Sequence, residues 1–197
     1  MTRLGLPGSP NPAASFDEVA RHIRWVGFDV DGVLTDAGVY IGQRDGHRIE
    51  LKRFDIRDGF GIKLLQWAEI DVAFVSARVS AATTERAAEL GVRDVIQENS
   101  GNKCEAIARL LEAKGLSWSQ AAFMGDDLPD VAVLQRVALA ACPADGVHEA
   151  RALAHLQLGA TGGRGAVREF AERLLKARGQ WDRVVGRYVT ERGGRWP

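Results

Sequence analysis

Asp29 and Asp31 are the first residues whose type and spacing suit chemistry. They fall at the end of the apolar run 25–30, which predicts a strand, and residues two apart on a strand project to the same side. Neighbouring carboxylates repel each other, which raises one pKa, and a bound cation reverses that shift for the carboxylate it touches. The pair suits a reaction in which one carboxylate binds a metal and attacks while the other carries a proton. Gly32 would let the backbone turn and approach an anion, although Asp and Gly are also common in ordinary turns.

A second group of carboxylates, Asp126, Asp127 and Asp130, follows the predicted strand over 120–124. Hard oxygen ligands in small number suit Mg²⁺, which binds one or two carboxylates together with a phosphate and several waters. Asp is also favoured at the start of a helix, but one Asp would be enough there. Three Asp residues in such a short stretch, together with the earlier pair, favour a metal site.

Two single residues complete the pattern. Ser76 follows the predicted strand over 72–75, and its hydroxyl and the backbone N–H of Ala77 could hold phosphate oxygens. Lys103 stands at the start of a predicted helix, where a cation opposes the helix dipole unless it meets an anion. Each is weak evidence alone, because a serine after a strand is common and most surface lysines are merely solvated.

The four features together describe phosphoryl transfer. They supply a nucleophile, a proton carrier, phosphate-binding groups, a cation and a metal site, each after a predicted strand. Phosphoryl transfer depends on this kind of positioning and charge stabilisation around a metal-bridged phosphate. Because enzymes must supply on the order of 20 kcal/mol for phosphate monoesters, a complete set is more informative than any single residue.

Alternating strands and helices must position these residues. We expect strands over 25–30, 72–75, 95–96, 120–124, 138–141 and 156–158, and helices over 58–69, 80–90, 102–114, 128–137, 147–154 and 166–176. Asp58 is the expected N-cap of the first of these helices. The order predicts an α/β fold, a Rossmann-like and mostly parallel sheet with helices on both faces. Ligands of such a sheet lie beyond the carboxyl ends of its strands.

The rest of the chain predicts one domain with a small insertion. The segments 38–41 and 48–54 flank a turn signal at Asp45 and Gly46, which indicates a β-hairpin flap over about 38–54. A chain of 197 residues is long enough for one sizeable core. The expected organisation is a poorly ordered lead-in over 1–22, a single domain over 23–178 and a C-terminal tail over 179–197.

Composition excludes several classes of partner. Lys and Arg total 26, and Asp and Glu total 26, which gives no general attraction for nucleic acid or anionic membranes. No apolar run approaches the roughly 20 residues that span a bilayer, and the N-terminal stretch lacks the apolar centre of a secretory signal. Cys104 and Cys142 are expected to be free thiols in a reducing cytoplasm. We therefore expect a cytoplasmic protein that acts on a small molecule, with neither nucleic acid nor membrane as a partner.

The motifs resemble those of the haloacid dehalogenase (HAD) superfamily of phosphatases. The stretch 28–36 looks like the first motif of that superfamily, and Ser76, Lys103 and the stretch 125–127 look like the second, third and fourth. The resemblance covers about residues 25–141 and implies a HAD core without a large cap domain.

A narrower resemblance is to the 3-deoxy-D-manno-octulosonate 8-phosphate (KDO 8-phosphate) phosphatase family. It rests on the immediate hairpin insertion and on the stretches 54–61 and 162–169, which extend the match to about residues 25–179. This family works as a homotetramer in which the hairpins associate at the centre and neighbouring subunits help cover each active site. Its product, KDO, enters the lipopolysaccharide of Gram-negative bacteria. The resemblance therefore implies a sugar-phosphate substrate and Mg²⁺ as cofactor.

The resemblance also implies roles for the acidic residues. Asp29 would attack phosphorus and become an aspartyl phosphate, and Asp31 would protonate the leaving sugar oxygen and then activate water. Mg²⁺ would be held by the Asp29 carboxylate, the Asp31 backbone carbonyl and the Asp126 carboxylate. Asp127 would orient water at the metal.

The other matching residues would bind the substrate. The phosphate would be held by Ser76, Lys103 and backbone N–H groups near Gly32 and Ala77. The residues that could meet the sugar acid are Arg78, Arg164 and Lys63.

Two departures from the family pattern and three alternatives remain open. Ala77 stands where the second motif usually has Gly, and the tail beyond Gly179 is longer than usual. A phosphatase for a nine-carbon sugar-acid 9-phosphate would share all four motifs. A receiver-type signalling domain also has Asp, Ser or Thr, Lys and Mg²⁺ at strand ends, but Asp31 favours rapid hydrolysis over a lasting phosphoprotein. The complete catalytic set argues against the third alternative, a non-catalytic binding subunit.

Overall fold

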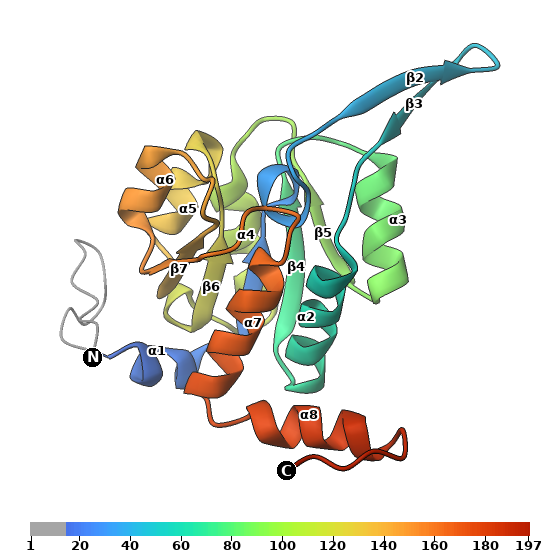
Figure 1. The fold of residues 1–197 in the computed structure, drawn as a ribbon. Helices are drawn as coiled ribbons and strands as arrows, with labels where there is room; N and C mark the ends of the chain where they lie inside the picture. Colours follow the sequence, from blue (N-terminus) through green and yellow to red (C-terminus); the bar gives the residue numbers. More distant parts are fainter. Residues whose placement is uncertain (1–14) are drawn as a thin grey trace.

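A sheet of six parallel strands forms the centre of residues 15–197, the part of the chain that the computed structural model describes (Figure 1). The strands are β1 Trp25–Phe28, β4 Asp71–Ser76, β5 Asp94–Gln97, β6 Ala121–Met124, β7 Leu139–Cys142 and β8 Leu156–Gln157. They lie in the order β5-β4-β1-β6-β7-β8. Every pairing of neighbouring strands in this sheet is parallel, which confirms the α/β fold class.

Helices cover both faces of the sheet (Figure 1). They are α1 Phe16–His22, α2 Ile56–Trp67, α3 Ala81–Leu90, α4 Lys103–Ala113, α5 Val131–Leu134, α6 His148–Leu153, α7 Ala166–Ala177 and α8 Trp181–Thr190. Because side chains of a strand alternate between faces, Val26 and Phe28 share a core cluster with α2 and α7, whereas Trp25 shares one with α4 and α5. Phe28 meets Phe170 of α7 edge to face, with ring centroids 5.9 Å apart.

The inserted segment forms an antiparallel hairpin that extends away from the sheet (Figure 1). Its strands are β2 Tyr40–Arg44 and β3 His47–Leu51. Asp45 and Gly46 between them have positive φ values of 51° and 77°, as the turn signal in the sequence predicts. The described residues contain no large cap domain, so the expected small flap is confirmed.

The chain changes direction across the sheet at β1. From β1 it crosses to β4 and β5 on one side, and then to β6, β7 and β8 on the other. In a parallel sheet the carboxyl ends of the strands open a crevice at such a switch point. The residues that follow β1, β4 and β6 therefore meet at one end of the sheet, the end from which the hairpin rises (Figure 1).

Helix α2 begins two residues earlier than predicted, and its N-cap is Asp55 rather than Asp58. Oδ1 of Asp55 accepts the N–H of Arg57 at 2.8 Å. The buried Asp58 carboxylate instead accepts the N–H groups of Gly165 at 3.0 Å and Arg168 at 2.9 Å, at the start of α7. A residue expected to begin one helix therefore caps another.

The helix predicted over 128–137 is shorter and divided. The chain forms a 3-10 turn over Leu128–Asp130 and then the short helix α5. The Asp127 side chain accepts the N–H of Leu128 at 2.7 Å, and the Asp130 carboxylate accepts the N–H of Asp126 at 3.0 Å. These local hydrogen bonds stabilise a tight turn in place of regular helix.

The lead-in expected over 1–22 needs correction at residues 16–22, which form α1. A capping box between Ser15 and Glu18 begins this helix, and its buried Ala20 packs in the core. The part of this prediction that concerns residues 1–14 lies outside the described residues.

The tail expected over 179–197 contains α8. Tyr188 of this helix stacks on Trp67 of α2 with ring centroids 5.3 Å apart and meets Phe60 edge to face. Aromatic packing therefore attaches the tail to the rest of the chain. The sheet and the helices α2 to α7 lie within the stretch 23–178 that the sequence assigns to one domain.

Candidate active site

Asp29 lies at the carboxyl end of β1, at the open end of the sheet. Its backbone N–H donates to the carbonyl of Met124 at 2.9 Å, which extends the pairing with β6 by one residue. Its side chain is buried, and Oδ1 accepts a hydrogen bond from Nζ of Lys103 at 2.5 Å. The expected nucleophile and the expected phosphate-binding cation therefore lie together, although 74 residues separate them in the chain.

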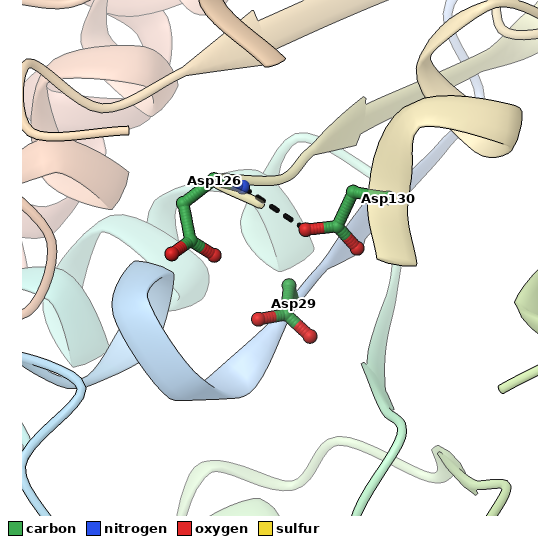
Figure 2. Close-up of side chains that lie close together, drawn as sticks. All are labelled: Asp29, Asp126 and Asp130. Atoms are coloured by element: carbon green, nitrogen blue, oxygen red, sulfur yellow. Dashed lines mark hydrogen bonds between the residues drawn. The ribbon is translucent and has the colours of Figure 1, made fainter. Parts of the chain in front are cut away.

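Three carboxylates converge at this point (Figure 2). Oxygen atoms of Asp29, Asp126 and Asp130 lie within 4.8 Å of one another. Lys103 also donates to Oδ1 of Asp130 at 2.7 Å, while Oδ2 of Asp130 accepts the N–H of Asp126 at 3.0 Å. Asp130 therefore holds both the lysine and the loop that carries Asp126.

Gly32 allows Asp126 to approach the loop after β1. Its φ is 100°, and a Cβ atom at this position would collide with the Asp126 carboxylate. Thr35 closes the turn, because its N–H donates to the carbonyl of Val30 at 3.0 Å. Both conformation and space therefore require glycine here. The expected contact between the Gly32 backbone and phosphate stays a prediction.

Burial dominates the electrostatics of this cluster. Burial, and then the negative charge of Asp130, raise the pKa of Asp29 well above its usual range, against the opposing charge of Lys103. Burial, followed by the charges of Asp130 and Asp127, raises the pKa of Asp126 to about 7. Burial by itself would lower the pKa of Lys103, but the charges of Asp29 and Asp130 outweigh it and raise that pKa. Further positive charge at the cluster would favour the ionised form of Asp29 and Asp126.

A divalent cation fits this cluster by charge and by donor type. Three carboxylates and one ammonium, when all are ionised, leave two negative charges. Oδ1 of Asp126 is buried and has no hydrogen-bond partner within residues 15–197. Carboxylate oxygens are ligands that Mg²⁺ prefers. Since Asp130 already accepts from Lys103 and from the backbone, Asp29 and Asp126 are the carboxylates suited to the metal.

A second charged group lies beside the cluster and includes Asp31. Nζ of Lys52, which follows β3, lies 2.7 and 2.9 Å from the two carboxylate oxygens of Asp31. Arg78, which follows β4, donates to Glu50 of β3 at 3.0 Å, and its Nε lies 3.9 Å from Oδ2 of Asp31. The hairpin therefore reaches both the expected proton carrier and one expected substrate-binding arginine.

The other residues expected in the second motif lie at the end of β4. Ser76 is buried there, and its Oγ accepts the N–H of Arg78 at 3.0 Å. Ala77 directly follows the last residue of β4, at the open end of the sheet. Their contacts with phosphate stay predictions.

Three expected site residues make other contacts. The Arg164 guanidinium lies 3.5 Å from the carboxylate of Asp36 rather than at the carboxylate cluster. The exposed Asp127 caps its own turn, so its expected role toward water at the metal stays a prediction. Lys63 needs correction as a possible substrate contact, because its Nζ donates to the carbonyl of Leu90 at 2.5 Å. A cation there complements the carboxyl end of α3.

Three residues of these groups have no individual role predicted from the sequence. Asp130 belongs to the acidic stretch 125–130, and its position four residues after Asp126 indicates a shared side of the following turn. Glu50 and Lys52 lie two residues apart, which puts them on one face of an extended segment. Nothing local in the sequence indicates that this face of the hairpin lies against Asp31.

Comparison with known proteins gives consistent relatives. The 3-deoxy-D-manno-octulosonate 8-phosphate phosphatase KdsC of Escherichia coli (strain K12) is 37% identical over 170 residues, which are 86% of this chain and 88% of that protein. A crystal structure of the phosphatase of the same name from Moraxella catarrhalis, in complex with magnesium, phosphate and KDO, is 32% identical with a TM-score of 0.82. The match covers 87% of this chain and 97% of that one.

A further solved structure shows the same fold with another metal. The cobalt-bound form of the deoxy-D-mannose-octulosonate 8-phosphate phosphatase from Haemophilus influenzae is 31% identical with a TM-score of 0.75. The match covers 83% of this chain and 94% of that one. No protein-family model matches the chain.

Proposed function

Since this chain belongs to the KDO 8-phosphate phosphatase family of the HAD superfamily, we propose that it hydrolyses KDO 8-phosphate to KDO and inorganic phosphate. The chain is a phosphatase, and its cofactor is Mg²⁺. The observation that carries the proposal is the contact between Asp29 and Lys103 within the carboxylate cluster at the switch point of the sheet. A nucleophile, a cation and metal ligands in one cluster are what phosphoryl transfer requires.

The first step transfers the phosphoryl group to the protein. An oxygen of the Asp29 carboxylate attacks phosphorus, the bond between phosphorus and the sugar oxygen breaks, and an aspartyl phosphate forms. The carboxylic acid of Asp31 gives its proton to the leaving oxygen, so that the sugar leaves as an alcohol rather than an alkoxide.

The second step hydrolyses the aspartyl phosphate. Asp31, now a carboxylate, takes a proton from a water molecule whose oxygen attacks phosphorus. The bond between phosphorus and the Asp29 oxygen breaks, inorganic phosphate leaves and the Asp29 carboxylate is restored. Asp31 ends the cycle protonated, ready for the next substrate.

Further groups bind and orient the phosphate. Lys103 balances part of its charge, and the Ser76 hydroxyl and the backbone N–H groups of Gly32 and Ala77 donate to its oxygens. The residues that would hold Mg²⁺ are Asp29 and Asp126 through their carboxylates and Asp31 through its backbone carbonyl. When bound, Mg²⁺ supplies positive charge that stabilises the charge developing on the phosphate.

Two arginines are candidates for the sugar-acid carboxylate. Arg78 is the better supported, because its half-exposed guanidinium lies beside Asp31 and is oriented by Glu50. Arg164 is the second candidate, and its exposed guanidinium is held near the base of the hairpin by Asp36. A guanidinium can bind a carboxylate through two parallel hydrogen bonds.

We further propose a cytoplasmic homotetramer in which each active site lies near a subunit interface. The exposed apolar side chains of the hairpin, Tyr40, Ile41 and Leu51, support the association. The free Cys104 and Cys142 fit a reducing compartment. Within the part of the chain that the structure describes, no helix combines the length and the apolarity needed to cross a membrane. Because the chain is a phosphatase, the receiver-type and non-catalytic alternatives are set aside.

Phosphate release from KDO 8-phosphate with Mg²⁺, measured beside a panel of sugar phosphates, tests the proposal. The panel includes a nine-carbon sugar-acid 9-phosphate. We expect release that depends on Mg²⁺ and strongly favours KDO 8-phosphate. Preference for the nine-carbon substrate would keep the mechanism and reject the proposed substrate. No release from any member of the panel would reject the proposed activity.

A further inference from the structure

Lys52 is a buried cation that the reaction described above does not use. Its side chain has no exposed surface, whereas the side chain of its partner Asp31 is 20% exposed. Its Nζ lies within hydrogen-bonding distance of both carboxylate oxygens of Asp31. Because burying an ammonium is costly unless it is paired, the position of Lys52 depends on Asp31 and on the negative charge of Glu50, whose Oε1 lies 3.8 Å from Nζ.

The difference in exposure gives the direction from which Lys52 approaches. The Lys52 side chain has no exposed surface, and Oδ1 of Asp31, 2.7 Å from Nζ, is buried as well, so Nζ reaches Asp31 from the protein side. Lys52 therefore cannot contact a substrate in this arrangement. Glu50, whose nearer oxygen is 3.8 Å from Nζ, stabilises the lysine from the hairpin side and also binds Arg78.

We propose that Lys52 is a positioning residue for the proton carrier. Its hydrogen bond fixes the Asp31 carboxylate so that the group can give a proton to the leaving oxygen and later take one from water. The inference rests on the proposed function and deepens it. Since Lys52 belongs to the hairpin segment and Asp31 to the loop after β1, the flap is coupled directly to proton transfer.

The proposal predicts that the leaving group decides how much Lys52 matters. The bond to a sugar oxygen breaks well only if Asp31 supplies a proton, because an alkoxide is a strong base. The bond in 4-nitrophenyl phosphate breaks without a proton, because 4-nitrophenolate is a weak base. The rate of 4-nitrophenolate release therefore depends on Asp29, Lys103 and the metal, and does not depend on proton donation by Asp31.

Single-turnover kinetics of Lys52→Met, with enzyme in excess and Mg²⁺ present, test this prediction. The signal is formation of KDO or of 4-nitrophenolate, which precedes hydrolysis of the aspartyl phosphate, so neither that hydrolysis nor product release limits it. The rate on KDO 8-phosphate should fall by about 100-fold, while the rate of 4-nitrophenolate release should stay within about threefold of wild type. Inhibition by inorganic phosphate should be unchanged, because Lys52 does not touch phosphate.

Lys114→Met is a matched control. Lys114 also pairs with two carboxylates, Asp71 at 3.2 Å and Asp94 at 2.9 Å, but these lie at the amino ends of β4 and β5. This variant should lose the same kind of ion pair and keep both rates. Lys52→Arg keeps the charge with a different geometry, and should show a loss of about 10-fold on KDO 8-phosphate alone. It also replaces Lys52→Met if that variant does not fold.

Equal losses on both substrates, or no loss on either, would overturn the inference. A weaker inhibition by phosphate would overturn it too, because it would make Lys52 a phosphate ligand. Failure of the proposed function is a separate result. It would appear as wild-type protein that acts on neither substrate, or as Asp29→Asn protein that keeps its activity.

Discussion

Asp126 and Asp29, the proposed metal ligands, are single residues that are expected to link proton binding to metal binding. Burial raises the pKa of both carboxyl groups in the metal-free protein, that of Asp126 to about 7 from an ordinary value of 3.8. A carboxyl group whose pKa is higher in the folded state contributes stability that is present below its unfolded pKa. That contribution is lost as the pH rises through its folded pKa. For Asp126, the metal-free protein should therefore lose stability as the pH rises from about 3.8 to about 7.

Mg²⁺ should offset that loss, because it favours the ionised carboxylates. We expect the increase in Tm on adding Mg²⁺ to be larger at about pH 8 than at about pH 5, where protons compete with the metal. Thermal denaturation in EDTA and in Mg²⁺, carried out at each pH, measures the increase in Tm. Asp126→Asn should remove most of the difference between the two pH values. An equal increase in Tm at both would contradict this linkage.

Asp29→Asn tests the nucleophile directly. An amide oxygen is a poor nucleophile, so turnover should fall by at least about 10³-fold. Removing one buried carboxylate from a cluster of three also relieves repulsion, so the metal-free variant should melt no lower than the wild type. Phosphate release and thermal denaturation measure the two effects. Full activity in this variant would reject Asp29 as the nucleophile.

Asp58 connects two secondary-structure elements, the helices α2 and α7. Its carboxylate belongs to α2 but accepts backbone N–H groups at the start of α7, beside the loop that contacts the turn after β1. In that loop, the N–H of Gly163 donates to the carbonyl of Val33 at 2.9 Å. A cap on α7 therefore also supports the backbone around the loop after β1.

Asp58→Ala should destabilise the fold by about 1–2 kcal/mol, the usual cost of losing a helix cap. Urea denaturation measures this change in the free energy of unfolding. Asp58→Asn keeps one acceptor oxygen and should lose less. Glu112→Ala replaces an exposed acidic residue of α4 and should change stability by less than about 0.5 kcal/mol. A loss in Glu112→Ala as large as that in Asp58→Ala would argue against the capping role.

The hairpin and the C-terminal helix lie at opposite ends of the whole molecule (Figure 1). The hairpin rises from the end of the sheet that carries the candidate active site, whereas α8 packs near the other end. Within one subunit the tail therefore does not cover the site. Completion of the site by a neighbour would depend on how subunits associate.

If subunits associate through the hairpin, a charge placed on its exposed apolar surface should weaken the association. Leu51 is 61% exposed and Ile41 is 64% exposed. Leu51→Glu should weaken the proposed tetramer, because a buried carboxylate without a partner is costly in an interface. Light scattering at micromolar concentration measures the mass. His47→Glu, at the hairpin tip, is the control and should keep the wild-type mass. A wild-type monomer would reject the proposed tetramer.

Local patterns in the sequence account for much of the fold and part of the site. Apolar runs and helical spacing of apolar residues indicate the order of strands and helices, because each pattern involves only residues a few positions apart. That order places Asp29, Ser76 and Asp126 at or just beyond the carboxyl ends of β1, β4 and β6. In a parallel sheet the carboxyl ends of adjacent strands meet. The expected N-cap at Asp58 was wrong because Asp55 offers the same chemistry three residues earlier.

Only the tertiary structure decides which charges are paired. Lys103 joins Asp29 to Asp130, and Lys52 reaches Asp31, across separations that no local pattern encodes. The sequence by itself determined the chemical groups at the strand ends, because strand and turn preferences are local. The partners of those groups depend on how the sheet, the helices and the hairpin pack together. Packing also buries them, and burial determines how much each charge needs its partner.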